Sequence, residues 1–80
     1  MAQAYFHTYK YAEAERELTA LLSEDENRAD LYLWLGRIRY NQGHLDEAVS
    51  YYSKAINRQK DFDQAYRFRA SAFKDMGDLQ

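Results

Sequence analysis

The side chains that could carry out chemistry are two histidines and a series of carboxylates in the first third of the chain. His7 and His44 have no cysteine to join them, and no carboxylate stands at a metal-ligand spacing on the same helical face. Glu13, Glu15 and Glu17 lie two residues apart, so a helix would point them in different directions. Neither arrangement predicts a metal site or an acid–base pair. We expect His7 and His44 to be solvated turn residues.

The acidic run Glu24-Asp25-Glu26 is the other candidate for a cation site. It lacks the spaced ligands and the glycine of a calcium-binding loop, and the chain has no glycine-rich phosphate loop. We therefore expect a solvated loop at the acidic run. The sequence predicts a chain that is not an enzyme and holds neither a cofactor nor a metal.

Composition bounds the remaining function classes. The 80 residues are enough for one small domain, and their hydrophobic content of 46% includes thirteen aromatic rings, eight of them tyrosine. A net charge of −2 argues against nucleic acid as a partner. No apolar run approaches a membrane span, and no basic segment followed by an apolar one begins the chain. We expect a cytoplasmic protein that does not bind a membrane.

Helical spacing runs through the middle of the chain and is interrupted once. Apolar residues between Leu31 and Ile56 recur at steps of three and four, on both sides of a break at Gly43. Glycine takes a positive φ at no steric cost, so Gly43 can end one helix before the next begins. The pattern predicts a helix-turn-helix hairpin. We expect helices over about Ala12–Glu24, Ala29–Gln42, Asp46–Gln59 and Asp63–Met76, with a short helical stretch before Tyr9.

The hairpin is one copy of a repeat with an offset of 34 residues. At this offset an aromatic residue, a glycine and a leucine recur: Tyr32 with Tyr66, Trp34 with Phe68, Gly43 with Gly77, and Leu45 with Leu79. An aromatic-x-x-Leu-Gly segment, then an alanine and a further aromatic, is the tetratricopeptide signature. In the central copy the matching residues are Tyr32, Leu35, Gly36, Gly43, Leu45, Ala48, Tyr52 and Ala55. The chain resembles the tetratricopeptide repeat family over essentially its whole length.

This resemblance implies an all-α fold in which antiparallel helix-turn-helix hairpins stack as a short α-solenoid. It divides one domain, residues 1–80, into a partial repeat (1–28), a complete repeat (29–62) and a second partial repeat (63–80). Tyr9 stands where the first hairpin glycine should be, which leaves open a turn at 9–11 or a single helix over about residues 2–23. The buried positions implied are Tyr32, Leu35, Gly36, Ala48, Tyr52, Ala55, Tyr66, Ala70 and Phe73.

Two arginines depart from the family pattern. Arg39 stands where the family usually has a large aromatic residue. Arg69 replaces a core leucine, the counterpart of Leu35, which suits either a solvated face or an ordinary surface substitution.

The resemblance also implies a function, which is protein–protein interaction through a concave groove lined by the first helix of each hairpin. The groove residues expected here are Trp34, Arg37, Tyr40, Asn41, Arg67, Phe68 and Lys74, with Asp30, Leu33, Gln64, Ser71 and Asp75 beside them. Three cations opposed by Asp30 and Asp75 predict a protein or peptide ligand that is acidic and carries an apolar anchor.

Two alternatives stay open. Trp34 could instead pack against Phe68 as part of the core. The chain could also be a structural or assembly element, either a fragment of a longer array or a unit that self-associates as a homo-oligomer. The apolar ends that would drive association are expected around Tyr5 and Phe6 at one end, and around Phe73 and Leu79 at the other.

Overall fold

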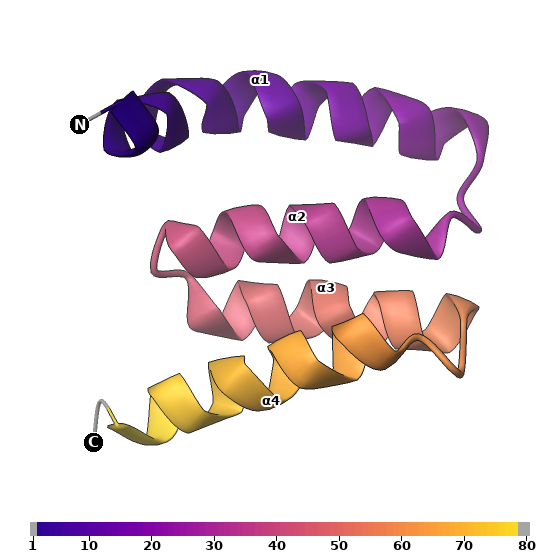
Figure 1. Ribbon diagram of the computed structural model, residues 1–80. Coiled ribbons are helices and arrows are strands. Elements are labelled where there is room, and N and C mark those ends of the chain that lie inside the picture. The colour runs from indigo at the N-terminus through magenta and orange to yellow at the C-terminus, as the bar shows by residue number, and fades with distance from the viewer. Residues whose placement is uncertain (1, 79–80) are drawn as a thin grey trace.

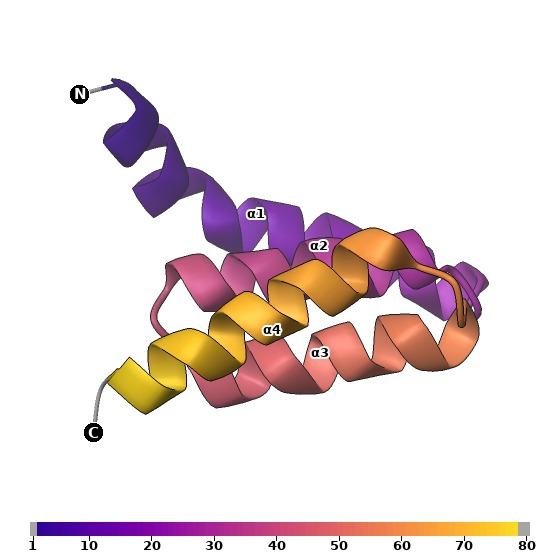
Figure 2. The ribbon, with the colours of Figure 1, turned by 60° about the horizontal axis from the view of Figure 1, so that its bottom comes forward.

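The fold consists of four helices joined by short turns. The computed structural model describes the backbone of residues 2–78 and the side chains of residues 11–77. Its helices are α1 (Ala2–Glu24), α2 (Ala29–Asn41), α3 (Leu45–Arg58) and α4 (Asp63–Asp78), and the described residues contain no strand. Successive helices run antiparallel, and α4 crosses the α2–α3 pair obliquely (Figures 1 and 2). The all-α fold is confirmed, and the expected ends of α2, α3 and α4 are correct to within two residues.

α1 is a single helix, so the turn expected at residues 9–11 is wrong and the one-helix alternative is correct. The segment from Ala2 to Glu24 contains no glycine or proline that would end a helix, and Tyr9 lacks the left-handed freedom that Gly43 has. The N-terminal half of α1 diverges from the other helices (Figure 2). Tyr5, Phe6 and Leu79 lie outside the residues whose side chains are described.

Gly43 ends α2 as expected. Its φ of 85° lies in the left-handed region. The N–H of His44 donates to the carbonyl of Arg39 at 2.9 Å, and the N–H of Gly43 donates to that of Tyr40 at 3.0 Å. This pair of bonds is the Schellman motif, which satisfies the last carbonyls of a helix and reverses the chain. The reversal brings α3 back along α2.

α2 and α3 are in close contact where Gly36 meets Tyr52. Tyr52 has no exposed surface. A Cβ atom placed on Gly36 would lie 2.5 Å from Cε1 and 2.6 Å from Cδ1 of the Tyr52 ring, closer than carbon atoms can pack. The absence of a side chain at position 36 is therefore what allows the ring to fit between the helices. Burial is confirmed at Leu35, Gly36, Ala48, Tyr52 and Ala55, whereas Tyr32 is half-buried.

Arg39 ties three helices together. Its guanidinium pairs with the carboxylate of Glu15 in α1 and, at 3.2 Å, with that of Glu47 in α3. The Arg39 side chain is 23% exposed and that of Glu15 is 29% exposed, so this pair is better shielded than an ordinary surface pair, whereas Glu47 is 54% exposed. The departure from an aromatic residue at this position thus replaces ring packing with ion pairs.

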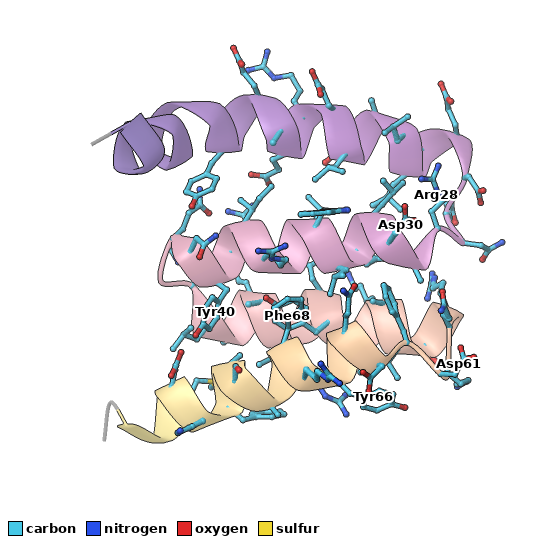
Figure 3. All side chains as sticks on the ribbon, viewed as in Figure 1. Arg28, Asp30, Tyr40, Asp61, Tyr66 and Phe68 are labelled. Atoms are coloured by element: carbon cyan, nitrogen blue, oxygen red, sulfur yellow. The ribbon has the colours of Figure 1, made fainter. Side chains whose placement is uncertain are left out.

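α4 turns a different face inward from the one expected. Ala65 and Ala72 have no exposed surface, and Phe68 packs against the core. Tyr66 and Phe73 are 42% and 53% exposed, and Ala70 is exposed as well, so the predicted burial of all three is wrong. The reason is that their counterparts in α2 pack against the following helix, α3. No described helix occupies the corresponding side of α4. Figure 3 shows Tyr66 on the side of α4 that is turned away from α2.

No described helix combines the length and the apolar character needed to cross a membrane.

The contact between Gly36 and Tyr52 makes a prediction about stability. Gly36→Ala places a methyl group against a ring that has nowhere to move, so the free energy of unfolding should fall by about 1–3 kcal/mol. Gly77→Ala is the matched control, because it adds the same methyl to α4 where, apart from the nearby backbone of α4 itself, it meets nothing within 4 Å. The control should be neutral or should stabilise by up to about 1 kcal/mol. Urea denaturation of both variants measures this, and equal effects would contradict the packing.

Candidate peptide-binding surface

Five side chains from α2 and α4 form one surface, which we call the α2–α4 surface. They are Trp34, Arg37 and Tyr40 from α2, and Phe68 and Asp75 from α4. Steps of three residues put the members from α2 on one helical face, and a step of seven does the same in α4. All five are half-buried or exposed. The predicted groove residue Lys74 is exposed and lies off this face, because a step of six residues from Phe68 turns about 120° around the helix. Figure 3 shows Tyr40 and Phe68 on the same side of the molecule, between the ribbons of α2 and α4.

Arg37 lies between two aromatic rings at the centre of this surface. Its Cζ atom is 5.0 Å from the centroid of the Trp34 ring and 5.0 Å from that of Phe68. A guanidinium at this distance is attracted to the negative face of each ring. Trp34 is 48% exposed, so it is not a core residue. Arg37 thus bridges Trp34 and Phe68, the two aromatic residues that were predicted to line the groove.

Phe68 rests on the core. Its ring stacks on that of Tyr52, with centroids 5.9 Å apart and an angle of 27° between the planes. Because Tyr52 is fully buried, Phe68 has a fixed base on one side and Arg37 on the other. The position of this half of the surface is therefore set by the packing of α3. Sequence reasoning assigned Tyr52 to the core but missed this supporting contact.

A hydrogen bond makes the second tie between α2 and α4. The hydroxyl of Tyr40 donates to the carboxylate of Asp75, 35 residues further along the chain. This bond is the main reason that the pKa of Tyr40 is raised above its usual value, because the ionised phenolate could not donate. Asp75 was expected only as a groove neighbour, and its carboxylate is already engaged.

The remaining predicted groove residues contribute unequally. Arg67 pairs with Asp63 one turn earlier in α4, at 3.0 Å, and both side chains are largely exposed (77% and 72%). Sequence reasoning missed this pair, although an Asp–Arg spacing of four residues on a helix is the signal for it. Asn41 is exposed beyond Tyr40 at the end of α2. Leu33 is only 4% exposed and belongs to the core cluster, so its expected place in the groove is wrong.

Asp30, at the start of α2, is paired outside the surface. Its carboxylate accepts two hydrogen bonds from Arg28, at 3.1 and 2.9 Å, and these hold the pKa of Asp30 below its usual value. It therefore does not offset the charge of Arg37. Within the described part of the chain, no three His, Cys, Asp or Glu side chains are grouped to hold a metal ion.

These features define a class of protein, the solenoids built from antiparallel helical hairpins. A family model described as tetratricopeptide repeat matches residues 2–72, so the chain belongs to the tetratricopeptide repeat family. Repeats of this family typically mediate protein–protein interaction and are generally non-catalytic modules. None of the curated proteins matches the chain.

The burial of Tyr52 predicts that the protein loses stability at alkaline pH. Burial raises the pKa of Tyr52 to about 12, from an ordinary value of about 10. The folded protein therefore holds this proton more tightly than the unfolded chain does. The resulting stability is complete below pH about 10 and is lost as the pH rises toward about 12.

Urea denaturation across this pH window measures the effect. Tyr52→Phe removes the ionisable group while keeping the ring, so the variant should lose less stability between these pH values than the parent chain does. Parallel loss in both chains would contradict the role of Tyr52.

Proposed function

We propose that the α2–α4 surface binds an extended protein segment that carries acidic residues and one aromatic or aliphatic side chain. The observation that supports this is the position of Arg37 between the rings of Trp34 and Phe68, with nearly half of Trp34 exposed. Tryptophan and arginine are the residue types that most often dominate binding energy at protein interfaces. The rings offer an apolar anchor its contact area, and the guanidinium offers a carboxylate two parallel donors.

The charges of the surface favour an acidic ligand. Arg37 carries the preference from the centre of the surface, because Arg67 is already balanced by Asp63. Asp75 keeps its negative charge while it accepts from Tyr40, so it offsets part of this preference. This differs from the sequence expectation, which counted Arg67 among the unopposed cations. Cations at a binding surface mainly speed the approach of an acidic partner, whereas buried rings slow its release.

Affinity should be weak. An extended segment loses conformational freedom when it binds, and two helices offer it limited contact area. We expect dissociation constants of roughly tens of micromolar or higher. A second function, the assembly of copies of the chain, is favoured by a separate observation, the exposed aromatic side chains of Tyr66 and Phe73.

The chain has one tryptophan, and it lies in the proposed site, so its fluorescence reports binding directly. The probes are a synthetic peptide of glutamates around one leucine and the same peptide with lysine at each glutamate position. The acidic peptide should change the emission of Trp34 in a saturable way, and the basic one should not. Arg37→Gln should weaken binding about tenfold, as expected for the loss of a central anchor.

Trp34→Ala should weaken binding of the acidic peptide to a similar extent. Because this variant lacks the fluorescent residue, its binding is measured by calorimetry. Tyr66→Ala is the matched control, because it removes an aromatic ring of comparable exposure from the opposite side of α4 and should leave affinity unchanged. Equal binding of the two peptides, or equal losses in Trp34→Ala and Tyr66→Ala, would overturn the proposal.

A further inference from the structure

α4 presents an apolar face that no described helix covers. We call Tyr66, Arg69, Ala70 and Phe73 the α4 outer face. At the repeat offset of 34 residues they correspond to the face of α2 that packs against α3, formed by Tyr32, Leu35, Gly36 and Arg39. Gly36 is buried in α2, whereas its counterpart Ala70 is exposed in α4. The α4 outer face therefore resembles the face that α2 packs against α3, but no described helix packs on it.

α1 presents the other half. We call Ala14, Glu17, Leu18 and Leu21 the α1 outer face. They correspond to Ala48, Tyr51, Tyr52 and Ala55 of α3. Ala48, Tyr52 and Ala55 have no exposed surface because α2 and α4 enclose α3, but α1 packs against α2 alone among the described helices. Leu21 is accordingly 43% exposed, and Leu18 is only half-buried.

We propose that the α1 outer face of one copy of this chain packs on the α4 outer face of a second copy. The two copies together then rebuild, between them, the helix pair that α2 and α3 form within one copy. This rests on the proposed division of the chain into a complete repeat at residues 29–62 flanked by two partial ones.

Side-chain volumes on the two faces are complementary. Within one copy, Gly36 leaves the space that the Tyr52 ring fills. At the corresponding positions of the proposed contact, Ala70 adds one methyl group and Leu18 is smaller than tyrosine. The larger residue on α4 is therefore matched by a smaller residue on α1. Position 36 has no room for a methyl group beside the Tyr52 ring. Position 70 has room for one, because the smaller Leu18 of the other copy takes the place of the tyrosine.

Charge is complementary as well. Arg69 is half-buried on the α4 outer face, where its Cζ lies 5.5 Å from the Tyr66 ring centroid and its guanidinium donates to Ser53 Oγ at 3.1 Å. Glu17 corresponds to Tyr51, whose Cβ lies beside Gly36 and whose ring centroid is 6.5 Å from that of Tyr32. By this correspondence Glu17 of one copy lies beside Tyr66 of the other, within reach of Arg69. The arginine that replaces a core leucine thereby gains a carboxylate partner.

The contact is head-to-tail, because the two faces differ. Each added copy leaves one α1 outer face and one α4 outer face free, so the assembly grows as an open chain. The α2–α4 surface stays accessible, because Tyr66 and Phe68 lie on opposite sides of α4 (Figure 3). Assembly and peptide binding are therefore separable by mutation.

Sedimentation velocity across micromolar to millimolar concentrations of the 80-residue chain tests the proposal. The average mass should rise continuously beyond that of a dimer. Phe73→Ser changes an exposed side chain, so it should leave the helical circular dichroism signal intact while weakening association about tenfold or more. Trp34→Ala should leave association unchanged even though it weakens peptide binding, which separates failure of this proposal from failure of the proposed function.

A charge exchange tests the orientation of the contact. Arg69→Glu alone and Glu17→Arg alone each place like charges across every contact, so each variant should remain monomeric. An equimolar mixture restores opposite charges at every contact between unlike chains and should associate as the parent chain does.

Three results would overturn the proposal. One is a single-chain mass at millimolar concentration, which would mean that a different protein or a further segment of a longer chain covers these faces. The second is a mass that stops at a closed dimer. The third is a mixture that behaves no differently from the two variants alone.

Discussion

The fold depends on the contact between Gly36 and the Tyr52 ring. The ring fits only because α2 has no side chain at that point, and it carries no exposed surface. It also stacks on Phe68 of α4 at 5.9 Å between centroids. One side chain of α3 therefore sets the separation of α2 from α3 and gives α4 the ring on which it packs. A larger residue at position 36 would displace both helix pairs together.

The contact between Gly36 and Tyr52 also positions the candidate binding surface. Tyr52 supports Phe68, and Arg37 lies between Phe68 and Trp34. The hydrogen bond from Tyr40 to Asp75 holds α2 and α4 together near their C-terminal ends. Side chains that are held in place before binding lose less freedom when a partner arrives. The core thus preorganises the surface that we propose for peptide recognition.

The sequence predicted the elements well and the exposed faces less well. Helix ends and the reversal at Gly43 depend on local spacing and backbone freedom, which a single chain displays directly. The repeat pattern indicates which face of α4 would pack against a following helix. Among the described helices none packs on that face, so the residues predicted to be buried there are exposed. α4 instead buries Ala65, Phe68 and Ala72. The place of Arg37 between two rings depends on how α4 crosses α2, which no local pattern encodes.

A double-mutant cycle between Gly36→Ala and Tyr52→Leu tests the central contact most directly, through the free energy of unfolding of the four chains. If the methyl group at position 36 is costly because of the ring, its cost should disappear once leucine replaces tyrosine. The predicted coupling is about 1–3 kcal/mol, the size of the overpacking penalty. Additive costs, with Gly36→Ala equally destabilising in both backgrounds, would contradict the account.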